Sequence, residues 1–154
     1  MTFAVMGDVP YSAPEYPLLR GQLKQLPMSV RFVMHVGDIK PQTEPCVETI
    51  YSRLAAIFLQ SPKPFFILPG DNEWIDCQFP KNGWKYWKKH LALFDQKFKH
   101  DLPVSRQKKR TENIVWLENE ILFVWLSLVG GRVYDQREWA AFLKDAADWV
   151  EKSF

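Results

Sequence analysis

The stretch VRFVMHVGDIK, residues 30–40, decides the fold, because it joins an apolar β-type run to a Gly-Asp pair directly at its end. The same order occurs at two other places, and the three pairs are Gly7-Asp8, Gly37-Asp38 and Gly70-Asp71. Successive pairs are separated by about the length of one strand–helix unit. Because the carboxyl ends of parallel strands share one edge of a sheet, we expect the three aspartates to converge there.

Three carboxylates at one edge point to a bound cation. Such a cluster repels itself unless a positive ion neutralises it. We therefore predict Asp8, Asp38 and Asp71 as metal ligands. Oxygen ligands without imidazole favour Mn²⁺, Mg²⁺ or Ca²⁺ over zinc or iron.

The first half of the chain reads as β-α-β-α-β. Apolar runs at Thr2–Met6, Val30–Val36 and 64–69 predict strands that are buried on both faces of a parallel sheet. Apolar residues at helical spacing lie between them, over 16–26 and 50–58. We expect right-handed crossovers and a ligand crevice at the carboxyl ends of the strands.

The second half predicts a helix, a β-hairpin and a C-terminal helix. Trp84, Trp87, Leu91, Phe94 and Phe98 follow helical spacing, and residues 102–111 read as a basic loop. Two β runs at 114–117 and 121–128 flank a short polar turn, and residues 139–150 form a last amphipathic pattern. The predicted fold class is thus an α/β layered sandwich with a mostly parallel sheet.

Length and composition are those of one globular domain over residues 1–154. No run of eighteen apolar residues occurs, so we expect no membrane span. No secretory signal is visible at the N-terminus. The sequence gives no indication of the oligomeric state.

Positive charge is concentrated in residues 81–110, which contain ten Lys or Arg and two Asp, a net charge of +8. With Trp84, Tyr86 and Trp87 interleaved, this segment allows a single-stranded nucleic-acid binder as one interpretation. A solvated helix face followed by a loop is the interpretation we favour, because the tryptophans lie on the seam that the core should cover. His90 and His100 in this segment are then expected at the surface.

Cys46 and Cys77 each lie a few residues after a Gly-Asp pair. Loops at the same sheet edge would bring them together as a disulfide, which would favour a periplasmic or secreted protein. Two unpaired thiols in a reducing cytoplasm are the equal alternative.

The phrases GDVPYS (7–12), HVGDIK (35–40) and PGDNEWIDC (69–77) resemble the motifs of the calcineurin-like metallophosphoesterases. Downstream, ENIVW (112–116) and ILFVWLSLVGG (121–131) are also similar to a divergent branch of that superfamily. The resemblance covers most of the chain. It implies a phosphatase-like hydrolase that acts on a small phosphorylated substrate.

By this resemblance, Asp8 binds a first metal ion, Asp38 bridges two, and Asp71 stands where the family has a metal-binding Asn. Two such ions polarise a phosphoryl group and lower the pKa of a water molecule that attacks phosphorus. Asn72 replaces the family's catalytic His, and we predict that it hydrogen-bonds a phosphate oxygen. Pro10 occupies the position of another family His.

For several further residues the sequence leaves more than one role open. Glu73 and Asp76 either replace a missing ligand or accept loop hydrogen bonds. Lys40 either pairs with Asp38, meets substrate phosphate or lies in solvent, and the last is favoured. His35 lies inside a strand and is expected to pack there rather than bind metal.

The family's remaining His ligands come from later strands, and this chain contains no such motif. We expect it to be either the front part of a longer protein or a reduced member with weak metal binding. A module that binds phosphate or a cation without hydrolysis is therefore the main alternative to the hydrolase.

Overall fold

The first half of the chain alternates strands and helices in the computed structural model, which describes residues 1–130, 133 and 135–153. The elements are β1 (Thr2–Met6), α1 (Glu15–Lys24), β2 (Val30–His35), α2 (Glu48–Phe58) and β3 (Phe65–Ile67). The predicted β-α-β-α-β order is confirmed.

The second half forms a helix, an antiparallel sheet and a C-terminal helix. Its elements are α3 (Pro80–His90), the 3₁₀ helix η1 (Phe94–Lys97), β4 (Ser105–Arg106), β5 (Ile114–Glu118), β6 (Ile121–Trp125) and α4 (Gln136–Ser153). Strand β4 lies within the segment that we predicted as a loop. The α/β fold class is confirmed.

Two three-stranded sheets organise the molecule. One is parallel with the order β1-β2-β3, and the other is antiparallel with the order β4-β5-β6. In the parallel sheet Met6 is in register with His35, and His35 with Ile67. The three strands therefore end at the same level, and the segments that follow them leave the sheet at one edge.

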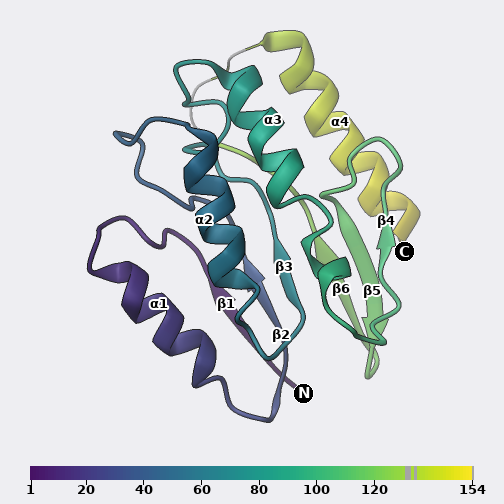
Figure 1. Cartoon of the computed structure of the whole chain (residues 1–154). Helices are drawn as coiled ribbons and strands as arrows, with labels where there is room; N and C mark the ends of the chain where they lie inside the picture. The colour runs from purple at the N-terminus through teal and green to yellow at the C-terminus, as the bar shows by residue number, and fades with distance from the viewer. Residues whose placement is uncertain (131–132, 134, 154) are drawn as a thin grey trace.

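Strands β2 and β3 are buried on both faces, as their continuous apolar sequences require, but the edge strand β1 is largely exposed, with Val5 54% exposed, contrary to the prediction. Helices α1, α2 and α3 pack on one face, where Leu23, Phe58 and Trp87 belong to one core cluster. The antiparallel sheet packs on the other face, where Phe32 of β2 contacts the rings of Trp116 and Phe123. Figure 1 shows the helices along the parallel strands and the hairpin β5–β6 on the other side.

The predicted helix over residues 84–98 breaks in its middle. Pro80 occupies the first turn of α3, where a missing N–H costs nothing. The helix ends at His90, and Leu93 adopts a left-handed conformation with φ 53°. Phe94 nevertheless stays in the core, on a 3₁₀ turn. The apolar spacing was read correctly as core, but the helix is shorter than predicted.

No helix in residues 1–130 and 135–153 combines the length and apolar character that a membrane span needs.

A disulfide joins the loop after β2 to the loop after β3. It links Cys46 and Cys77, whose Cα atoms are 5.7 Å apart across a sequence separation of 31 residues. The bridged alternative is the one in the structure, and it is compatible with an oxidising compartment.

We predict that reduction of this disulfide lowers the free energy of unfolding by about 2–4 kcal/mol, because the open chain gains loop entropy when it unfolds. Urea unfolding with and without a phosphine reductant measures the change. The double variant Cys46→Ser/Cys77→Ser is the control and should not respond to the reductant. Two free thiols in natively purified protein would contradict the prediction.

Candidate functional site

Asp8, Asp38 and Asp71 lie around one depression of about 220 Å³ at the carboxyl edge of the parallel sheet. Each lies within four residues of the end of its strand, and because the strands end at the same level, the three aspartates come together. Asp8 and Asp38 adopt left-handed conformations, with φ 56° and 58°. Val129, after β6, lines the same depression from the side of the antiparallel sheet.

Two glycines allow this close approach. Gly37 has φ +104°, and a Cβ there would lie 2.5 Å from the backbone nitrogen of Gly70. A Cβ on Gly70 would collide with the carboxylate of Asp38. The Gly-Asp pairs after β2 and β3 are thus packed against each other, which only glycine permits.

Tyr11 and Asn72 connect the acidic residues, and sequence analysis assigned no role to Tyr11. Its hydroxyl donates to Asp8 Oδ1 at 3.0 Å, and Asn72 Nδ2 donates to the same hydroxyl at 2.8 Å. The backbone N–H of Asn72 donates to Asp38 Oδ1 at 3.2 Å. Burial, the hydrogen bond to Asp8 and the charge of Asp38 raise the pKa of Tyr11, so it stays a donor. The sequence signal that could have pointed to Tyr11 is its position within the motif GDVPYS.

The carboxyl of Asp38 is affected both by burial and by the charges of the other two aspartates of the depression. Burial raises the pKa of its carboxyl to about 6, the N–H of Asn72 opposes this shift, and the carboxylates of Asp71 and Asp8 add to it. The neighbouring negative charges therefore disfavour the ionised form of Asp38. A bound cation would instead favour the ionised form of Asp38.

The donor set suits a hard divalent cation, but the side chains are not gathered around one point. Within residues 1–130, 133 and 135–153, no group of three or more His, Cys, Asp or Glu is arranged to hold a metal ion. The hydroxyl of Tyr11 instead bonds Asp8. Cation binding would therefore require the three aspartates to turn toward a common centre.

Glu73 accepts hydrogen bonds from both Gly-Asp loops, which is the second of its two predicted roles. Its side chain is buried, and it accepts the N–H groups of Gly70 at 2.7 Å, Asp38 at 3.1 Å and Ile39 at 3.3 Å. Burial raises its pKa to about 7, while the N–H groups oppose that rise. Glu73 thus fixes the two loops to each other beneath the depression.

Lys40 is buried, against the favoured expectation of a solvated side chain. Its ammonium donates to the carbonyl oxygens of Pro41 at 3.2 Å and Glu44 at 2.7 Å. Burial lowers its pKa, and the charge of Glu73 opposes that shift. Lys40 therefore orders the loop after β2.

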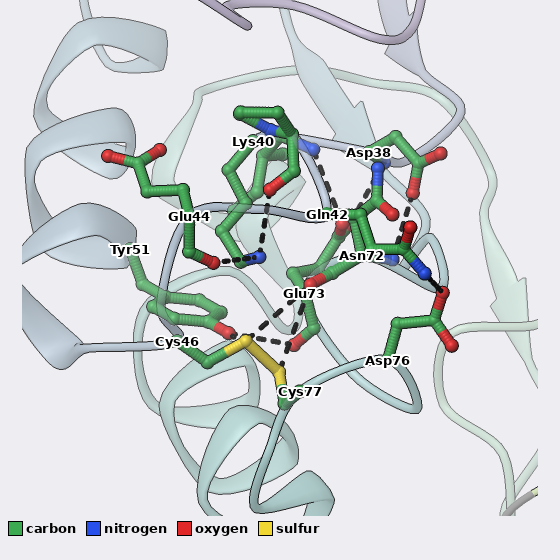
Figure 2. Close-up of a disulfide and its surroundings, with 12 residues drawn as sticks. Asp38, Lys40, Gln42, Glu44, Cys46, Tyr51, Asn72, Glu73, Asp76 and Cys77 are labelled. Atoms are coloured by element: carbon green, nitrogen blue, oxygen red, sulfur yellow. Dashed lines mark hydrogen bonds between the residues drawn. A yellow bond between two sulfur atoms is a disulfide. The ribbon is translucent and has the colours of Figure 1, made fainter.

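Figure 2 shows the Cys46–Cys77 disulfide and Asp76 in the two loops, with Asn72 and Glu73 between the disulfide and Asp38. Asp76 Oδ2 accepts a hydrogen bond from Gln42 Nε2 at 2.6 Å. Together with the Cys46–Cys77 disulfide, this bond joins the loop after β2 to the loop after β3.

His35 packs inside the molecule, as expected, and orders the first loop. The N–H of Gly37 donates to Nδ1 at 3.1 Å, so Nε2 carries the proton and donates to the Val9 carbonyl at 3.1 Å. Burial lowers the pKa of His35 to about 4, against the Val9 carbonyl and the charge of Asp8.

His90 and His100 are partly buried rather than freely exposed, and each lies beside a carboxylate. The ring of His90 lies 2.9 Å from Glu48, and that of His100 lies 3.6 Å from the buried Asp95. Both side chains are less than one-fifth exposed, at 18% and 12%.

Four of the ten Lys and Arg residues in the basic segment 81–110 pair with carboxylates of the same molecule. The pairs are Lys89 with Glu48, Arg106 with Asp95, Lys109 with Asp145, and Arg110 with Glu138. Trp84 is stacked between Trp74 at 4.2 Å and Trp87 at 5.1 Å, and Trp87 is 2% exposed. These contacts occupy four of the ten basic side chains and the stacked tryptophan faces, and nucleic-acid binding stays a prediction.

Comparison of the chain with family models, with curated proteins and with solved structures finds no match.

We predict that Glu73→Gln lowers the free energy of unfolding by about 2–4 kcal/mol, because the amide group presents N–H to backbone donors that need an acceptor. Chemical denaturation measures the loss. Glu151→Gln, an exposed substitution on α4, is the matched control and should change stability by less than about 0.5 kcal/mol. Equal stability of the two variants would contradict the role of Glu73.

A second prediction concerns pH. The pKa of His35 is about 4 in the folded protein, below its ordinary value of 6.5, so the unfolded chain takes up the proton first. Stability contributed by neutral His35 is therefore complete above pH 6.5 and is lost as the pH falls toward 4. We expect the stability advantage of wild type over His35→Gln to shrink by up to about 3 kcal/mol over this interval. Denaturant titrations at several pH values test this, and a constant advantage would contradict it.

Proposed function

We propose that this protein is a metal-dependent phosphoester hydrolase similar to the calcineurin-like enzymes. The observation that carries the proposal is the depression at the sheet edge, which is lined by Asp8, Asp38 and Asp71. The raised pKa of Asp38, caused by burial and neighbouring carboxylates, supports a positive ion at this place. The motifs around these three residues support the reaction class.

Asp8, Asp38 and Asp71 would hold the cation, and their oxygens favour Mn²⁺, Mg²⁺ or Ca²⁺. When bound, such an ion supplies charge for the phosphoryl oxygens and lowers the pKa of a water molecule. Glu73 keeps the Asp38 and Asp71 loops in contact through three backbone N–H groups. The chain thus contributes two loops that are held together and that carry acidic side chains at the edge of the sheet.

Asn72 is the polar group placed to meet the substrate. Its Nδ2 donates to the Tyr11 hydroxyl at 2.8 Å, so the amide already lies beside the acidic residues. A phosphate oxygen could accept from the same group. Because neither Asn72 nor Tyr11 is an acid near neutral pH, their role is to orient the phosphoryl group by hydrogen bonding.

The disulfide supports a periplasmic or extracellular location, where oxidising conditions maintain Cys46–Cys77.

We predict that Mn²⁺ or Mg²⁺ stabilises the wild-type protein, by about 2.7 kcal/mol at one hundred times the Kd, and that Asp8→Asn and Asp38→Asn abolish this effect. Thermal unfolding with metal and with chelator measures it. Asp148→Asn, on the distant helix α4, is the control and should retain the stabilisation.

Hydrolysis of an aryl phosphate by the same proteins separates the two candidate functions. Metal-dependent turnover in wild type that is lost in Asp38→Asn supports the hydrolase. Metal stabilisation without turnover supports the binding module instead. Absence of any response to Mn²⁺, Mg²⁺ or Ca²⁺ contradicts the site.

A further inference from the structure

The hydroxyl of Tyr11 belongs to a chain of hydrogen bonds that joins the loops after β1, β2 and β3. It donates to Asp8 Oδ1 at 3.0 Å and accepts from Asn72 Nδ2 at 2.8 Å. The backbone N–H of Asn72 in turn donates to Asp38 Oδ1 at 3.2 Å (Figure 2). One oxygen of Asp8 and one oxygen of Asp38 are therefore already bound to donors of this chain.

These two donors do not belong to the wall of the acidic depression. Asp8, Asp38 and Asp71 are among the described residues that line it, but Tyr11 and Asn72 are not. In the part of the chain that the structure describes, the three aspartates are not arranged to hold a metal ion. The hydrogen bonds from Tyr11 and Asn72 thus give a physical reason why carboxylates at one edge do not share a centre.

The backbone of Tyr11 is anchored to the start of α1. Its N–H donates to Glu15 Oε2 at 2.7 Å, and Ser12 Oγ donates to Glu15 Oε1 at 2.8 Å. The N–H of Glu15 donates to the carbonyl oxygen of Ser12 at 3.1 Å. Because this turn holds the backbone of Tyr11 to the helix, Asp8 can leave the hydroxyl only when one of the two side chains rotates.

We propose that the Tyr11 hydroxyl restrains Asp8 and thereby lowers the affinity of the acidic edge for a divalent cation. The inference rests on the proposed function, because it describes what regulates that metal site. To turn toward an ion, Asp8 Oδ1 must give up a hydrogen bond with a charged acceptor, and such bonds are stronger than those between neutral groups.

The opposite role is the common one for hydrogen-bond partners of metal ligands, which orient the ligand and strengthen metal binding. In that role the hydroxyl of Tyr11 would raise the affinity of Asp8 for the ion. The two roles therefore predict changes of opposite sign when the hydroxyl is removed, and a loss of local structure alone would not tighten metal binding.

Removal of the hydroxyl tests the inference directly. Tyr11→Phe should bind Mn²⁺ about tenfold more tightly than wild type, because Asp8 no longer gives up this bond. Electron paramagnetic resonance of free Mn²⁺ during a titration gives both dissociation constants. Tyr86→Phe, which removes a hydroxyl from α3 outside the depression, is the matched control and should bind as wild type does. Weaker binding by Tyr11→Phe overturns the inference.

A double variant tests whether the gain acts through Asp8. Tyr11→Phe/Asp8→Asn should bind Mn²⁺ no more tightly than Asp8→Asn alone, because the carboxylate that the hydroxyl restrains is absent from both. A tenfold gain in this background would mean that Tyr11 acts on another group, which overturns the restraint on Asp8.

The same titrations separate this inference from the proposed function. Mn²⁺ binding of equal affinity in wild type and Tyr11→Phe overturns the restraint by Tyr11 and leaves the metal-dependent hydrolase standing. Absence of Mn²⁺ binding in both proteins overturns the metal site and the hydrolase, and the restraint with them. Binding that is tighter in Tyr11→Phe supports both.

Discussion

The three backbone N–H groups bound by the buried carboxyl of Glu73 are the constraint on which the rest of the site depends. They come from Gly70 in its own loop and from Asp38 and Ile39 in the loop after β2. Donors that would otherwise be buried without partners thus receive one common acceptor, which is strongly favourable in a low-dielectric interior. The carbonyl of Glu73 is itself bonded by the Tyr51 hydroxyl at 2.7 Å, so α2 also anchors this point.

This arrangement explains how like charges can stand together at the sheet edge. Gly37 and Gly70 remove the side chains that would keep the two loops apart, and Glu73 binds the loops from below. The acidic groups therefore remain close although burial and mutual repulsion raise the pKa of Asp38. Stability from the loop contacts offsets an unfavourable charge distribution, which is a pattern typical of functional sites.

The sequence predicts the parallel sheet and the placement of Asp8, Asp38 and Asp71 because both follow from local periodicity and one topological rule. It leaves two roles open for Glu73, and for Lys40 it favours a solvated side chain where the structure has a buried one. Which backbone groups a side chain reaches across two loops depends on their tertiary approach, and an acidic or basic residue in a loop looks the same in either role. The early end of α3 was missed for a related reason, since Leu93 in a left-handed conformation carries no sequence signal.

The segment 71–77 connects all parts of the proposed chemistry. Asp71 lies at the acidic depression, the N–H of Asn72 donates to Asp38 Oδ1, and Cys77 binds the segment covalently to the loop after β2. The disulfide therefore does more than restrict the unfolded chain: it holds the loop that carries Asp71 to the loop that carries Asp38. Because reaction rates depend on how the reacting groups are placed, a tether at this position would, in the proposed hydrolase, act on the placement of the aspartates as well as on stability.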